Sequence, residues 1–114
     1  MNPPGSAQPY TWWHSMNGNI TKDGITLDLE AMKRVGVGGF QQFDVGPGMP
    51  TGTAAYDSPE YWELKRHVIK EAERLGLNFE MHNCAGWSSS GGPWIATELS
   101  MQVVTWSEVQ VEGG

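Results

Sequence analysis

Residues 77–94, with the sequence LNFEMHNCAGWSSSGGPW, contain the densest group of side chains that could bind a small polar molecule. His82 and Asn83 stand where a short strand should end, and Trp87 and Trp94 follow in a loop rich in Gly and Ser. Polar groups at the carboxyl end of a strand, beside aromatic rings, are typical of ligand sites in α/β proteins. The pairing of indole rings with hydroxyl and amide groups favours a sugar as the ligand.

Three further polar residues, His14, Asn17 and Asp44, stand at or just after the ends of two earlier predicted strands. His14 and His82 could each donate a hydrogen bond to a sugar hydroxyl, and Asn17 and Asn83 offer both donors and acceptors. Asp44 could accept a hydrogen bond from a hydroxyl group or bind a metal ion. Each of these residues also has a structural alternative, such as a hydrogen-bonded histidine or a side chain that stabilises a turn.

The neighbours of His82 have alternatives of their own. Cys84 and His82 are spaced like a nucleophile and its base, but the sequence offers no third group to orient the histidine, which disfavours a catalytic thiol. Glu80 faces either the interior, where it could pair with a residue of another strand, or a layer of helices. Trp87 could stack on a deoxy-sugar or pack within its loop, and loop packing is favoured for Trp94.

Five predicted elements have to position these residues. They are a strand over 10–16, a helix from the N-cap Thr21 to Gly36, a strand over 37–45, a helix from the N-cap Ser58 to Gly76, and a strand over 77–84. Hydrophobic residues recur at helical spacing in both predicted helices. In the first strand, Trp12 and Trp13 are expected to face opposite sides, one toward the interior and one toward the helices. A short helix over 98–102, capped by Thr97, should follow.

The order strand–helix–strand–helix–strand predicts an α/β fold with parallel strands and right-handed crossovers. The loops after the strands then lie on one side, so the six candidates should converge. The first strand–helix turn, residues 17–21, lacks the G-x-G-x-x-G pattern that cradles a pyrophosphate, and no phosphate-binding loop is present. The pattern fits the first three βα units of a (β/α)8 TIM-type barrel, which takes about 250 residues when complete.

We therefore divide the chain into three parts. Residues 1–9 form a leading loop, residues 10–102 form the N-terminal part of the barrel, and residues 103–114 form an extended segment that leads to a continuation.

The composition of the chain limits the classes of molecule that it could bind. The 114 residues carry a net charge of -6, which disfavours nucleic acid and anionic membranes, since both are bound through Lys and Arg. A single cysteine excludes an intrachain disulfide, and no stretch approaches the roughly 20 apolar residues of a membrane span. No signal peptide is visible. No H-E-x-x-H, C-x-x-C or D-x-D-x-D-G pattern occurs, so no residue is assigned as a metal ligand.

Five segments resemble glycoside hydrolase family 106, the α-L-rhamnosidases. They are residues 12–25 (WWHSMNGNITKDGI), 28–40 (DLEAMKRVGVGGF), 86–94 (GWSSSGGPW), 106–108 (WSE) and 111–114 (VEGG). The resemblance covers nearly the whole chain in order, and GWSSSGGPW is its most specific part.

This resemblance implies a large enzyme that hydrolyses terminal α-L-rhamnosyl residues of plant-type glycans with inversion and depends on calcium. It implies a secreted or periplasmic protein whose catalytic acid and base lie outside this chain. The substrate would be held by His14, Asn17, Asp44, His82, Asn83 and Trp87, and the chain by itself is expected to be inactive. Two alternatives remain open at this point: a non-catalytic carbohydrate-binding module that uses the Trp-rich loops, and a different barrel hydrolase.

Overall fold

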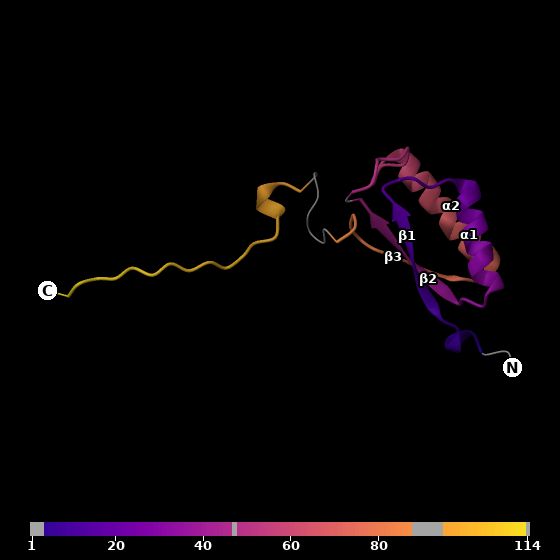
Figure 1. Cartoon of the computed structure of the whole chain (residues 1–114), viewed down its shortest axis with the longest axis horizontal. Helices are drawn as coiled ribbons and strands as arrows, with labels where there is room; N and C mark the ends of the chain where they lie inside the picture. The colour runs from indigo at the N-terminus through magenta and orange to yellow at the C-terminus, as the bar shows by residue number, and fades with distance from the viewer. Residues whose placement is uncertain (1–3, 47, 88–94, 114) are drawn as a thin grey trace.

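The computed structural model describes residues 4–46, 48–87 and 95–113. Three strands and two helices alternate along the chain, with a short 3-10 helix near each end (Figure 1). The elements are η1 (Gly5–Ala7), β1 (Tyr10–Met16), α1 (Lys22–Arg34), β2 (Gly39–Val45), α2 (Pro59–Leu75), β3 (Asn78–Met81) and η2 (Thr97–Leu99). The predicted α/β order is confirmed.

Both helices begin and end where the sequence predicts. The Thr21 hydroxyl accepts a hydrogen bond from the Gly24 amide at 3.1 Å, and the Ser58 hydroxyl accepts one from the Tyr61 amide at 3.1 Å. A side-chain cap of this kind stabilises a helix by about 1 kcal/mol. Gly76 ends α2 in the left-handed conformation, with φ at 61°, which suits a residue without a Cβ atom.

The three strands form one parallel sheet in the order β1-β2-β3, as predicted. Both pairings run without a slip: Tyr10 lies opposite Gly39 and Gly39 lies opposite Asn78, and the register continues from there. Side chains of a strand alternate between the two faces of a sheet. The unbroken register therefore aligns the alternation of all three strands, so that each row across the sheet presents its side chains to one face.

One face of the sheet packs against both helices. Phe40 is fully buried at the centre of this core, and Trp13 meets it edge-on with ring centroids 5.6 Å apart. The indole of Trp13 also donates a hydrogen bond to Asp28 of α1 at 3.0 Å. The other buried members of the core are Ile25, Leu29, Val68, Ala72 and Leu77. Trp12 lies on the opposite face, so the predicted split of the tryptophan pair is confirmed.

Three predicted boundaries were wrong. β2 begins at Gly39 rather than at residue 37, because the Val37 amide donates to the Met32 carbonyl and so belongs to the turn that closes α1. β3 is four residues long rather than eight, because after His82 the chain turns back toward the end of β2. The short helix predicted over 98–102 is a single 3-10 turn, since so short and exposed a segment cannot offset the cost of helix nucleation.

Residues 48–57, which precede α2, pack tightly on the first strand–helix turn. The Gly52 amide donates to the Asn17 carbonyl at 2.8 Å, and the Ala54 amide donates to the Gly18 carbonyl at 3.3 Å. A Cβ atom at Gly18 would lie 2.3 Å from the Ala54 carbonyl oxygen, so the two backbones can approach only because glycine stands there.

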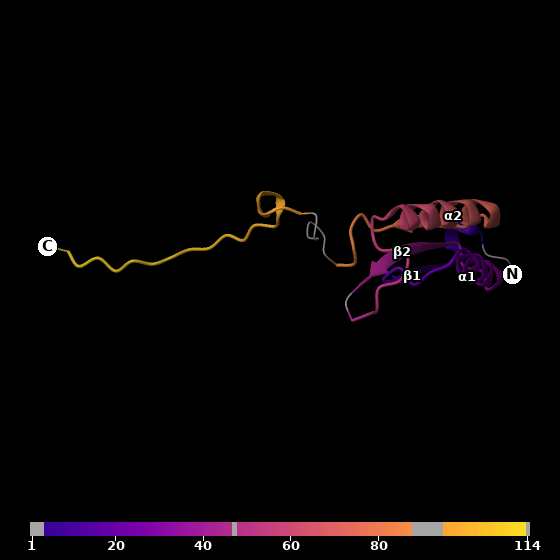
Figure 2. The same ribbon diagram turned by 90° about the horizontal axis from the view of Figure 1, so that it is seen from above.

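Residues 103–113 carry no helix or strand and run away from the sheet and helices (Figure 2). No helix among the described residues is both long and apolar enough to cross a membrane.

Two leucines of α1 provide a matched test of the core. Leu29 is 0% exposed and Leu27 is 66% exposed. We expect Leu29→Ala to lower the free energy of unfolding by about 2–5 kcal/mol, because the vacated volume is lost from a packed core. Leu27→Ala should change it by less than about 0.5 kcal/mol. Urea unfolding, followed by the protease sensitivity of this region, measures both. Equal losses for the two variants would contradict this core.

Candidate functional site

The face of the sheet that points away from the helices presents three aligned rows of side chains. From the amino to the carboxyl end of the strands, the rows are Tyr10–Gly39–Asn78, Trp12–Gln41–Glu80 and His14–Phe43–His82. His82 follows the end of β3 but still belongs to the last row, because its amide donates to the Gln42 carbonyl at 3.2 Å. Of the two orientations open to Glu80, the register selects the face without helices.

Phe43 is the centre of an aromatic cluster at the carboxyl end of this face. Its ring centroid lies 4.1 Å from that of His82, 4.6 Å from that of Trp87, 5.5 Å from that of Trp12 and 5.8 Å from that of His14. Phe43 itself is buried by these neighbours, while Trp12 is 58% and Trp87 is 65% exposed. Two large aromatic surfaces therefore remain open to a ligand. We call these five residues the Phe43 cluster.

The structure thus brings together three of the six predicted substrate-binding residues: His14, His82 and Trp87. A histidine stands on each side of Phe43, one on β1 and one directly after β3. Asn83 follows His82 and is exposed. Trp94 lies outside the described residues.

His82 has a partner behind it. Its Nδ1 atom lies 3.4 Å from the Sγ atom of Cys84, and the buried Cys84 thiol donates a hydrogen bond to the Gly86 carbonyl at 3.2 Å.

Asn17 is engaged in a different contact. Its side-chain amide donates to the Met49 carbonyl at 2.8 Å and to the Thr51 hydroxyl at 3.4 Å, and so it holds the segment over 48–57. This arrangement favours the structural alternative for Asn17, a residue that stabilises a turn.

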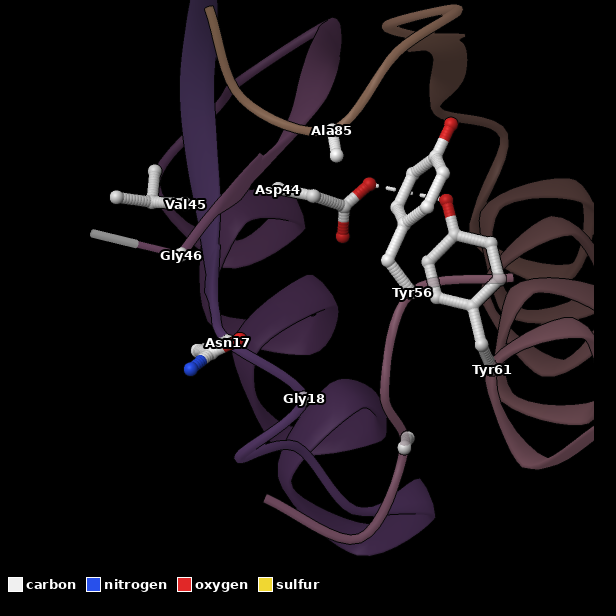
Figure 3. Close-up of a pocket in the computed structure, with 9 residues that line it drawn as sticks. Asn17, Gly18, Asp44, Val45, Gly46, Tyr56, Tyr61 and Ala85 are labelled. Carbon is white, nitrogen blue, oxygen red and sulfur yellow. Dashed lines mark hydrogen bonds between the residues drawn. The ribbon is translucent and has the colours of Figure 1, made fainter. Parts of the chain in front are cut away.

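Asp44 lies on the helix face of β2, one residue beyond Phe43 and therefore on the opposite side of the sheet. Its carboxylate accepts a hydrogen bond from the Tyr61 hydroxyl at 2.9 Å (Figure 3). The same carboxylate lies 3.5 Å from the ammonium group of Lys65. Lys65 also donates to the Gln42 side chain at 2.8 Å. The structure therefore separates Asp44 from the Phe43 cluster, which favours a structural role for this carboxylate.

Burial and the charge of Asp44 shift the pKa values of the two side chains beside it, Lys65 and Tyr61. Burial lowers the pKa of Lys65, and the negative charge of Asp44 opposes that shift. Burial, and then the Asp44 charge, raise the pKa of Tyr61 well above its usual range. The Tyr61 hydroxyl therefore keeps its proton and remains a hydrogen-bond donor to Asp44.

A small cavity opens beside this group, with Asp44, Tyr56 and Tyr61 on its wall (Figure 3). Its volume of about 60 Å³ suits a water molecule or two and is too small for a sugar. Among the described residues, no group of three or more His, Cys, Asp or Glu side chains is placed to hold a metal ion. The calcium dependence that the family resemblance implies stays a prediction.

Comparison with known proteins identifies the family. The model of the alpha-L-rhamnosidase family, glycoside hydrolase family 106, matches residues 1–114. The chain belongs to this family.

A solved structure, "Structure of Rhamnosidase from Novosphingobium sp. PP1Y", shares 50% identity with this family member and superposes with a TM-score of 0.72 over 82% of it. A protein of Formosa agariphila named "Putative beta-glucuronidase" is 50% identical over 113 residues. The chain covers 9% of the first of these proteins and 10% of the second. The resemblance to glycoside hydrolase family 106 is thereby confirmed, and the two relatives carry names that point to different sugars.

Sequence reasoning missed two members of the Phe43 cluster and the whole charge group beneath it. Trp12 was expected to face one side or the other, and Phe43 was not considered. Period-two counting back from Asp44 would have placed Phe43 on the open face and Asp44 on the face with Phe40. Lys65 stands four residues after Tyr61 and therefore on the same buried side of α2. A lysine on the buried side of a helix requires an acidic partner, and this requirement could have pointed to Asp44.

Asp44→Asn tests the structural role of this carboxylate. The variant removes the charge that balances the buried Lys65, so we expect the free energy of unfolding to fall by about 3–5 kcal/mol, as when one partner of a buried ion pair is removed. Sugar affinity should stay unchanged. Glu63→Gln, which removes the exposed partner of Lys22, is the control and should have no measurable effect. A loss of sugar affinity at unchanged stability would instead place Asp44 in the substrate site.

Proposed function

We propose that this chain supplies part of the substrate site of a glycoside hydrolase that removes terminal α-L-rhamnosyl residues from plant-type glycans with inversion. The observation that carries the proposal is the Phe43 cluster, which combines open aromatic surfaces with a histidine on either side. Membership of the alpha-L-rhamnosidase family and 50% identity to a solved rhamnosidase support the same reaction. The name of the Formosa agariphila relative makes a β-glucuronide the competing substrate.

The cluster suits a deoxy-sugar. A ring with a methyl group in place of one hydroxyl offers more apolar area to Trp12 and Trp87, which are the exposed indoles of the cluster. Neighbouring strands lie about 4.8 Å apart, so His14 and His82 stand roughly 10 Å from each other across β2. One sugar ring placed on the exposed surfaces of Trp12 and Trp87, between the two histidines, could therefore exchange hydrogen bonds with both of them. Asn83 is exposed next to His82.

The carboxylates have to be divided between this chain and the rest of the protein. Inversion requires two carboxyl groups about 6.5–9.5 Å apart, one to protonate the leaving group and one to activate water. Among the described strand residues of the open face, Glu80 is the one acid. We propose that the catalytic acid and base come from the remainder of a longer protein, and that the 114 residues alone are inactive. No step of this proposal depends on calcium.

The alternative function is a carbohydrate-binding module. The open indoles of Trp12 and Trp87 favour it as well, because stacking requires no carboxylate pair. Turnover separates the two functions.

The decisive experiment compares 4-nitrophenyl α-L-rhamnoside with the corresponding β-glucuronide as substrates of the whole protein that carries this chain. We expect release of nitrophenol from the rhamnoside alone, with the β-anomer of rhamnose as the first product in a time-resolved NMR spectrum. Release from the glucuronide alone would overturn the proposed substrate. Sugar binding without turnover of either compound would favour the binding module.

Trp87→Ala tests the stacking surface. Loss of an aromatic contact of about 0.5–1.5 kcal/mol should raise the KM for the rhamnoside about two- to twelvefold. The change in kcat should be smaller, because stacking acts on the bound sugar before and during reaction. Trp62→Ala is the control, since Trp62 lies on α2 and bonds to Asp57 away from the cluster. Equal kinetics for the wild-type protein and Trp87→Ala would remove Trp87 from the site.

A further inference from the structure

The hydrogen bonds behind His82 determine which of its ring nitrogens carries the proton. The Gly86 carbonyl can only accept, so the Cys84 thiol hydrogen must lie on the 3.2 Å contact between them. The same sulfur then offers lone pairs to Nδ1 of His82, 3.4 Å away. Nδ1 must therefore be the donor, and in the neutral ring Nε2 is left unprotonated.

The Gly86 carbonyl, which accepts the hydrogen bond from Cys84, is held in a fixed position. Gly86 adopts a left-handed conformation, with φ at 62°, and a Cβ atom there would lie 3.0 Å from the Asp44 carbonyl oxygen. The loop after β3 is thus pressed against the carboxyl end of β2. Cys84 is only 6% exposed, so no solvent competes for its thiol. These contacts fix the direction from which the sulfur meets His82.

The His82 ring is fixed on a second side by Phe43, which it meets at a centroid distance of 4.1 Å and an interplanar angle of 64°. Within the part of the chain that the structure describes, no side chain forms a hydrogen bond with Nε2. With Nδ1 bound to Cys84 and the ring packed against Phe43, Nε2 is the nitrogen of His82 that remains for a ligand in the Phe43 cluster.

We propose that Cys84 is a positioning residue that holds His82 in its Nδ1–H tautomer, so that Nε2 accepts a hydrogen bond from a sugar hydroxyl. The inference deepens the proposed function and rests on it, because it specifies how the cluster recognises its ligand. It also assigns the Cys84 thiol a role other than that of a nucleophile: the sulfur is buried, keeps its proton and orients the histidine.

The kinetic arm of the test uses the whole protein, 4-nitrophenyl α-L-rhamnoside and three variants. His82→Asn sets the size of the effect. Cys84→Ala removes the sulfur, and we expect KM to rise about fivefold, which corresponds to one ordinary hydrogen bond of about 1 kcal/mol, with kcat close to the wild-type value. Cys84→Ser keeps a group that can accept from Nδ1 and donate to Gly86, so KM should return to within about twofold of wild type, well inside one hydrogen bond.

A packing role for Cys84 predicts a different order, because alanine would then be tolerated at least as well as the more polar serine. Serine no better than alanine, or a wild-type KM in Cys84→Ala while His82→Asn raises KM, would overturn the inference and leave the proposed function standing.

The spectroscopic arm needs no substrate. The nitrogen chemical shifts of the ring are measured in protein labelled with 15N-histidine, and the His82 signals are assigned by their absence in His82→Asn. We expect the Nδ1–H tautomer in the wild-type protein and in Cys84→Ser, and a shift of population toward Nε2–H in Cys84→Ala. An Nε2–H tautomer in the wild type, or no change in Cys84→Ala, would overturn the inference. If the wild-type protein hydrolyses no rhamnoside, the proposed function fails and this arm still decides the role of Cys84.

Discussion

The parallel pairing of three strands in an unbroken register is the constraint on which the rest of the molecule depends. Because side chains alternate along a strand, two consecutive residues lie on opposite faces of the sheet and in different environments. Phe43 and Asp44 are neighbours in sequence, yet Phe43 joins four aromatic rings on the open face and Asp44 enters a charged group under α2. A slip of one residue in β2 would exchange these two positions and eliminate both arrangements.

The charged group under the sheet supports the aromatic face from behind. Taking Lys65 and Asp44 out of water is costly, and such pairs are often no more stable than hydrophobic residues of similar volume. The pair instead connects α2 to β2. Lys65 donates a hydrogen bond to the Gln42 side chain and lies close to Asp44, and Gln42 and Asp44 are the two residues on either side of Phe43 in β2. The carboxyl end of β2 is thereby attached to α2 at both positions beside the centre of the cluster.

Much of the fold could be predicted because its signals are local. Thr21, Ser58 and Gly76 mark helix ends through hydrogen bonds and backbone angles that lie within a few residues. The site was harder to predict, because its geometry is set by contacts far apart in the chain. A pattern of residue types does not show that Asn17 contacts Met49 or that Asp44 contacts Tyr61. These contacts engage Asn17 and Asp44. His14 and His82 instead lie in one row of the open face, on either side of Phe43, because both follow the alternation of parallel strands.

The close fit of Gly18 against the segment over 48–57 has a consequence for how such sites can diversify. Gly52 and Ala54 are bonded to the first strand–helix turn, and a side chain at Gly18 or Gly52 would collide with backbone. The two segments are therefore held together as one rigid corner at the carboxyl end of the sheet. Insertions in one of them would have to be matched by changes in the other, so new specificities in this scaffold should arise more readily from the strand ends that surround Phe43 than from this corner.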